Sequence, residues 1–234
     1  MNGEEKLNGN EIHTDSKALK RIENFWYHYK WPTIIVCFFT IVFLVCTLQM
    51  CNKKSYDVTV VYAGPYSMDS AGASDVKDVL NIVIPSDYDE DGEKSTELIS
   101  YLIYTKEQIE KIEAESSQYI DRAYASSESQ NFYNYAATEA GICFVDPSLY
   151  NSLKESDRLI SVTGVLGYAP KGLVDDNGVR LSETDIYNEY AVLQKLPADT
   201  VVCLLRKQLT KKEDVYAKEQ ETFKAIVNYN AAEK

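Results

Sequence analysis

Histidine is nearly absent from this sequence. The two residues of this type are His13 and His28, and none follows. Ser-His-Asp and Cys-His catalysis need an imidazole as general base, and most zinc sites need one as a ligand. The P-loop and the G-x-G-x-x-G pattern of nucleotide-binding proteins are also missing. The segment after position 28 therefore lacks the residues for these chemistries.

The catalytic patterns that remain are short and incomplete. Ser74 and Lys77 have the S-x-x-K spacing of a Ser-Lys nucleophile, and Ser129 and Asn131 resemble the S-x-N element, but the K-[ST]-G partner is missing. Paired carboxylates of a glycosidase are a further alternative. With 31 Asp and Glu residues between positions 55 and 234, nothing singles out one pair. We therefore predict that the chain is not an enzyme.

Cysteine is also scarce, with five residues in the chain. Cys37, Cys46 and Cys51 lie in or next to one apolar run, whereas Cys143 and Cys203 each lie in a short strand-like run. A disulfide between the last two requires neighbouring strands and an oxidising compartment. Two buried thiols are the alternative, and we expect these.

Basic residues are few after the apolar run. Residues 55–234 contain 17 Lys and Arg against 31 Asp and Glu. This negative balance disfavours nucleic acid and anionic membrane surfaces as partners, because both repel an acidic protein. We predict no nucleic-acid partner.

One long hydrophobic run is present. Residues 32–50 carry no charge, and a helix of this length extends about 28 Å, close to the thickness of the hydrocarbon core of a bilayer. The aromatic residues of segment 25–31 suit the headgroup level. The sequence thus predicts one transmembrane helix that contacts the lipid bilayer through residues 32–50.

The charges beside this run predict its orientation. Four basic residues lie within about fifteen residues before it and two lie directly after it: Lys17, Lys20, Arg21 and Lys30, then Lys53 and Lys54. Positive charge favours the cytoplasmic side. We expect a disordered cytoplasmic tail at 1–24, a transmembrane helix with an aromatic belt at 25–51, and an extracytoplasmic domain at 55–234. A cleaved signal peptide, or a lipoprotein acylated at Cys51, is the alternative.

Apolar patterns in the last 180 residues predict an α/β domain with a mixed sheet flanked by helices. Expected strands cover 57–62, 79–84, 96–104, 142–145, 159–165 and 201–205. Capping patterns predict helices from Thr105, Asp146 and Thr210, and a further helical segment covers 127–140. Asn177-Gly178 predicts a hairpin whose tight turn uses positive φ angles.

An acidic loop is a candidate metal site. Asp87, Asp89 and Asp91, followed by Gly92, match the start of a calcium loop, where short carboxylates at alternate positions converge on one cation. The twelfth position is Leu98 instead of glutamate, and the flanks resemble strands. Calcium bound by a β-loop-β turn is one hypothesis, and a solvated acidic turn is the other.

Tyrosine is abundant, with sixteen residues after position 54. Tyr62, Tyr66 and Tyr168 flank loops that contain Gly64 and Gly167. Tyrosine gives rigid, amphipathic contact area for ligands. We take Tyr62, Gly64, Tyr66 and Tyr168 as candidate ligand-binding residues, and half-buried strand tyrosines as the alternative.

Several segments resemble extracellular solute-binding proteins. The similarity lies in Phe132–Tyr150, Leu166–Tyr168, Val179–Glu183, Leu196–Val202 and Phe223–Asn228, and the loop from Asp87 to Gly92 is similar to that of membrane-anchored Gram-positive members. The resemblance implies a type-2 periplasmic-binding-like fold. A complete binding protein closes two lobes on its ligand, and 180 residues suffice for little more than one lobe.

Together these features predict a bacterial single-pass membrane protein with a non-catalytic role. The outer domain is expected to bind a small solute or a partner protein near the carboxyl ends of its strands. The alternative is a structural or interaction subunit of a membrane complex without a small-molecule ligand.

Overall fold

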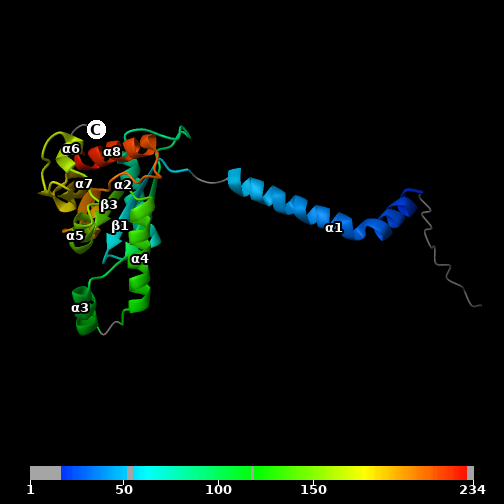
Figure 1. Ribbon diagram of the computed structural model, residues 1–234, viewed down its shortest axis with the longest axis horizontal. Coiled ribbons are helices and arrows are strands. Elements are labelled where there is room, and N and C mark those ends of the chain that lie inside the picture. Colours follow the sequence, from blue (N-terminus) through cyan, green and yellow to red (C-terminus); the bar gives the residue numbers. More distant parts are fainter. Residues whose placement is uncertain (1–16, 52–54, 117–118, 231–234) are drawn as a thin grey trace, which may run out of the picture. The chain divides into compact units, whose positions relative to one another are not determined.

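The computed structural model describes residues 17–51, 55–116 and 119–230. The chain divides into two compact units, Met1–Lys54 and Ser55–Lys234 (Figure 1). Within the described residues, the first unit contributes one helix, and the second contains the sheet.

Helix α1 (Lys17–Cys51) contains the apolar run. Its segment Asn24–Leu48 has a mean hydropathy of 2.4 and is long and apolar enough to cross a membrane. The helix already begins at Lys17, so residues 17–24, predicted as part of the disordered tail, are helical. Residues 1–16 lie outside the described part of the chain.

Two threonine hydroxyls on α1 bond to the backbone of the helix itself. Thr40 Oγ1 donates to the Val36 carbonyl and Thr47 Oγ1 to the Phe43 carbonyl, each at 2.8 Å. A hydroxyl that bonds within its own helix needs no partner from the surroundings. The two threonines are therefore compatible with an apolar environment.

The second unit is built on a six-stranded sheet in the order β2-β1-β3-β6-β5-β4. Strand β1 pairs in parallel with β2 and with β3, and the other pairings are antiparallel. This confirms the predicted mixed sheet. The carboxyl ends of β1, β2 and β3 lie at one edge. The strands are β1 (Val58–Gly64), β2 (Thr96–Leu102), β3 (Ile142–Val145), β4 (Leu173–Asp175), β5 (Gly178–Arg180) and β6 (Val201–Leu204).

Helices cover both faces of this sheet. One face packs on α2 (Ser70–Val83), α6 (Val162–Leu166), α7 (Asp185–Glu189) and α8 (Glu213–Val227). The other face packs on α4 (Arg122–Thr138) and α5 (Pro147–Glu155). Short 3-10 turns cover Leu181–Glu183 and Leu193–Lys195. Helix α3 (Lys106–Ser116) has no buried residue and lies beside the start of α4, beyond the sheet (Figure 1).

The strands divide their side chains between the two faces. Val60 and Tyr62 of β1 join the core under α2 and α8, whereas Val61 and Ala63 join the core under α4 and α5. Alternation with a period of two is expected for a strand. Because both faces of β1 are covered, its segment from Val60 to Ala63 is continuously hydrophobic.

Two predicted strands are wrong. Segment 79–84 is the end of α2, which begins where the Asp69 carboxylate accepts a bond from the Gly72 N–H. The buried residues of α2 recur at helical spacing: Val76, Val79, Leu80 and Val83. Segment 159–165 forms one bridge, Leu159 to Leu205, and then continues as α6.

The predicted caps have mixed outcomes. Gln108 N–H donates to Thr105 Oγ1 at 3.1 Å and Thr105 N–H to Gln108 Oε1 at 2.8 Å, which confirms the first capping box. Asp146 caps α5 as expected. The box at Thr210 is wrong, because α8 begins at Glu213 with Lys212 at the N-cap and no side-chain cap.

The hairpin of β4 and β5 is confirmed, but its turn differs from the prediction. Neither Asn177 nor Gly178 has a positive φ angle. Gly178 is needed for space, because a Cβ atom there would lie 2.6 Å from the Tyr150 ring and 2.6 Å from Val201. This glycine lets α5 approach the sheet closely.

Candidate functional site

The candidate ligand residues at the end of β1 belong largely to the core. Tyr62 is buried, and its hydroxyl accepts a hydrogen bond from the Tyr66 N–H at 3.1 Å. Burial raises the pKa of Tyr62 above its ordinary value. Gly64 ends β1 and is buried, and Tyr66 is half-buried. Tyr62 thus supports the loop and presents little surface.

Tyr168 is more accessible. Its side chain is 51% exposed, and its hydroxyl donates to the Asn228 side chain at the end of α8. The cavities described below are lined by other residues than these four candidates. Ligand binding at Tyr62, Gly64, Tyr66 and Tyr168 therefore stays a prediction.

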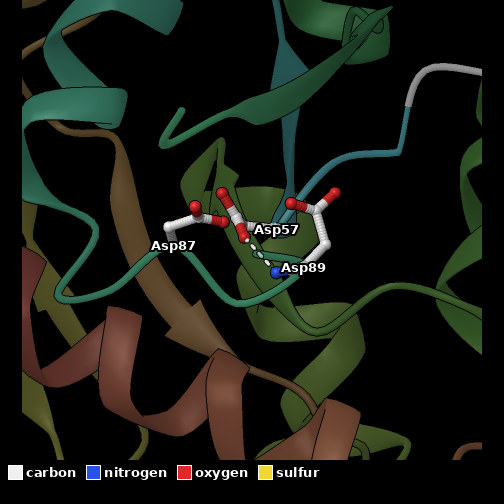
Figure 2. A group of neighbouring side chains, drawn as sticks. All are labelled: Asp57, Asp87 and Asp89. Atoms are coloured by element: carbon white, nitrogen blue, oxygen red, sulfur yellow. Dashed lines mark hydrogen bonds between the residues drawn. The ribbon is translucent and has the colours of Figure 1, made fainter. Parts of the chain in front are cut away.

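The acidic loop folds back on the first residue before β1. Carboxylate oxygens of Asp57, Asp87 and Asp89 lie within 4.8 Å of one another. Figure 2 shows the three side chains gathered beside the loop. The sequence prediction named Asp91 instead of Asp57. Asp91 is exposed, and its carboxylate accepts a bond from the Glu93 N–H. Asp57 was missed because it stands thirty residues before Asp87, and only the fold brings the two together.

Backbone N–H groups already bond to the oxygens of these carboxylates. Asp57 accepts hydrogen bonds from the Tyr88, Asp89 and Ser95 N–H groups. Asp87 accepts from Glu90 and Gly92, each at 2.8 Å, and these bonds lower the pKa of Asp87. The loop is therefore held in place by its own acidic side chains.

A cation remains compatible with this cluster. Asp89 Oδ2 is buried and has no hydrogen-bond partner among the described residues. Three carboxylates at this separation repel one another, and a divalent ion would relieve the repulsion. Every carboxylate here also has a structural role, so calcium binding stays a prediction.

A cavity of about 660 Å³ lies between α3 and α4, next to the carboxyl end of β2. Tyr104 follows β2 and lines it, together with Lys106 and Ile109 of α3. Arg122 and Tyr133 contribute from α4. The remaining lining residues are mostly small or polar: Glu110, Ala125, Ser126, Ser129, Gln130 and Asn134.

The two helices that form this cavity are joined by a salt bridge. Arg122 Nη2 lies 3.0 Å from Glu113 Oε2, with both side chains in contact with solvent. Such a pair contributes little stability, and α3 buries no residue. The cavity has the size of small-molecule sites, and its wall on the α3 side is weakly anchored. No motif marked it in the sequence, because its residues become neighbours only through helix packing.

The two cysteines of the sheet lie opposite each other. Cys143 of β3 pairs with Cys203 of β6, and both are buried free thiols. Burial raises the pKa of Cys143 to about 12 and that of Cys203 well above its usual value. These thiols therefore carry almost no thiolate at neutral pH, the form that acts as a nucleophile.

Comparison with known proteins finds no matching family model, no matching curated protein and no matching solved structure. The resemblance to solute-binding lobes thus stays a prediction.

Proposed function

We propose that this protein is a bacterial single-pass membrane protein whose α/β unit binds a small solute outside the cytoplasm, without catalysis. The observation that carries the proposal is the cavity between α3 and α4. It lies at the carboxyl edge of the parallel strands, where open α/β sheets bind their ligands. Its volume of about 660 Å³ suits a solute of modest size.

The membrane part of the proposal rests on α1. This helix is long and apolar enough to span a bilayer, and the basic residues gather before its apolar segment. This charge asymmetry supports an N-terminus inside the cell and a binding unit outside.

The composition of the cavity indicates the kind of ligand. Lys106, Arg122 and Glu110 offer charges of both signs, and Tyr104 and Tyr133 offer flat apolar area. Such a lining suits a polar solute that carries a carboxylate together with hydroxyl or amide groups, since Lys106 can pair with an anion and Arg122 has further N–H groups besides the one bonded to Glu113.

A thermal-shift screen of amino acids, sugar acids and short peptides against the full chain in nanodiscs tests the proposal. A hit should raise the melting temperature of the wild type. Ser129→Trp, which fills the cavity, should abolish that shift. Tyr168→Ala, which removes an exposed tyrosine elsewhere, should leave it unchanged.

If Tyr168→Ala abolished the shift and Ser129→Trp left it unchanged, the ligand would bind at the loops predicted from the sequence. A shift that survives both substitutions would contradict a site between α3 and α4. A chain that responds to no solute, but is recovered from its membrane bound to another membrane protein, would favour the interaction-subunit alternative.

A further inference from the structure

A second cavity lies at the opposite edge of the sheet. It measures about 550 Å³ and is formed by the start of β1, the end of α4 and the first turns of α8 with the loop before them. It shares no residue with the cavity between α3 and α4. The lining residues that could contact a ligand through charge or an aromatic ring are Tyr56, Asp57, Tyr135, Glu139, Lys211, Lys212 and Glu219.

A buried ion pair lines this cavity. Lys211 Nζ lies 2.6 Å from Glu219 Oε1, and the two side chains are only 8% and 6% exposed. Gly141 makes room for the carboxylate, because a Cβ atom at this position would lie 2.2 Å from Glu219 Cδ. Burial of two charges is costly unless all their hydrogen-bonding groups find partners. The fold therefore accommodates a buried Glu219 carboxylate at this cavity, with Lys211 as its counter-charge and Gly141 leaving the space for it.

One oxygen of this carboxylate is unsatisfied. Glu219 Oε2 is buried and has no hydrogen-bond partner among the residues that the structure describes. A buried carboxylate oxygen without a donor is unfavourable. A ligand that brings an N–H or O–H group to this oxygen would remove the penalty.

The charges around the cavity favour a cation as that donor. Lys211 is already paired with Glu219, and the Asp57 carboxylate accepts bonds from loop amides. Lys212 is exposed and is the second cation of the lining, which therefore holds two lysines and the three carboxylates of Asp57, Glu139 and Glu219. Glu139 is exposed and adds a negative charge at the rim. Glu97 is close by, since its Oε2 atom accepts a bond from Thr59 Oγ1. Burial, followed by the charges of Glu139 and Glu97, raises the pKa of Tyr135.

Aromatic rings complete the lining. Tyr56 and Tyr135 both line the cavity, and the Tyr56 ring already has Lys77 Nζ at 5.2 Å from its centroid. A carboxylate together with tyrosine faces is a chemical environment that favours ammonium groups.

We propose that this cavity binds a small primary amine, whose ammonium group donates to Glu219 Oε2 and faces the Glu139 carboxylate. The site is independent of the solute site proposed between α3 and α4. The protein would then have two binding sites of different charge preference, one at each edge of the sheet.

Calorimetry on the full chain in nanodiscs tests this proposal, with putrescine and ethanolamine as probes and 1,4-butanediol as the uncharged match. Both amines should bind saturably and raise the melting temperature, and the diol should do neither. Glu139→Gln should weaken amine binding roughly tenfold. Glu155→Gln on α5, an exposed residue away from the cavity, is the matched control and should bind like the wild type.

Three further variants keep the test decisive. Glu219→Gln should abolish amine binding. If this variant does not fold, Thr138→Trp, at an exposed position of the cavity lining, should instead block entry of the amine. Ser129→Trp should leave amine binding intact, which separates this site from the proposed solute site.

Three results would overturn the proposal. The first is an absence of saturable binding of either amine by the folded wild type, which would mean that water alone satisfies Glu219. The second is equal binding of the diol. The third is amine binding that is unchanged in both Glu139→Gln and Thr138→Trp.

Discussion

The most consequential single residues are charged groups that the fold removes from water. Lys211 and Glu219 form such a pair between α8 and the loop before it. The pattern of α8 contained a signal for this, because Glu219 stands among the buried positions Tyr216, Phe223 and Ile226. A carboxylate on the apolar face of a helix needs a partner, and the sequence could not show that Lys211 supplies it.

Removal of one partner of this pair should be strongly destabilising. Lys211→Met leaves the Glu219 carboxylate buried without a counter-charge, so we expect a loss of about 3 kcal/mol in the free energy of unfolding. The double variant Lys211→Met/Glu219→Leu should recover most of this loss. Urea unfolding in detergent, followed by circular dichroism, measures both. Equal losses in the single and double variants would contradict a coupled pair.

The pH dependence of stability should carry the signature of Glu219. Burial raises the pKa of Glu219 above 4.5, an effect partly offset by Lys211. The folded state therefore binds the proton of Glu219 more tightly than the unfolded state does. The resulting contribution to the free energy of unfolding is fully present below about pH 4.5 and is lost as the pH rises through the folded-state pKa. Cys143 of β3 and Tyr216 of α8 are two further titratable groups that interact with it.

Thermal unfolding of the wild type and Glu219→Gln between pH 4 and pH 7 measures this effect. The melting temperature of Glu219→Gln, relative to the wild type, should increase as the pH rises. A difference that stays constant with pH would show that folding leaves the Glu219 pKa unchanged.

At the scale of elements, helix starts and the hairpin were predicted well where side chains bond to nearby backbone. Thr105 and Asp146 cap their helices as expected, and the hairpin at Asn177 forms. Segment 79–84 was misassigned, because a short apolar run fits a strand as well as a buried helix face. The φ angles of the Asn177 turn also differed, since Gly178 is selected by packing against Tyr150.

The acidic loop should depend on Asp57 more than on its own carboxylates. Asp57→Asn replaces one acceptor oxygen by a donor, which would face the Ser95 or the Asp89 N–H. We expect a loss of about 1–3 kcal/mol in the free energy of unfolding and faster hydrogen exchange at these amides. Asp91→Asn, at an exposed position, is the control. Equal exchange rates in the two variants would refute this role.

Calcium tests the same loop in a different way. If Asp57, Asp87 and Asp89 share one ion, millimolar calcium should raise the melting temperature of the wild type and a chelator should reverse the change. Asp57→Asn should reduce the effect more than Asp91→Asn. A melting temperature that does not respond to calcium would leave the loop as a structure held by its own amides.

At the scale of the whole molecule, the alternation of apolar runs was sufficient to predict one apolar helix followed in the chain by an α/β unit with a mixed sheet. The candidate sites could not be predicted in the same way. Asp57 meets Asp87, and Lys211 meets Glu219 above Gly141, through contacts that no local pattern encodes. The cavity at the start of β1 likewise arises where α4 and α8 meet a distant segment of the chain, whereas the cavity between α3 and α4 depends on how two consecutive helices pack.

The side of the membrane on which the α/β unit lies is the most direct test of the account. Leu209 is fully exposed, and the thiols of Cys143 and Cys203 are buried. Leu209→Cys, in a chain with Cys51→Ser, provides a reporter for a membrane-impermeant maleimide. An outer binding unit predicts labelling at position 209 on intact cells. Labelling that appears only after lysis would place the unit in the cytosol and contradict the account.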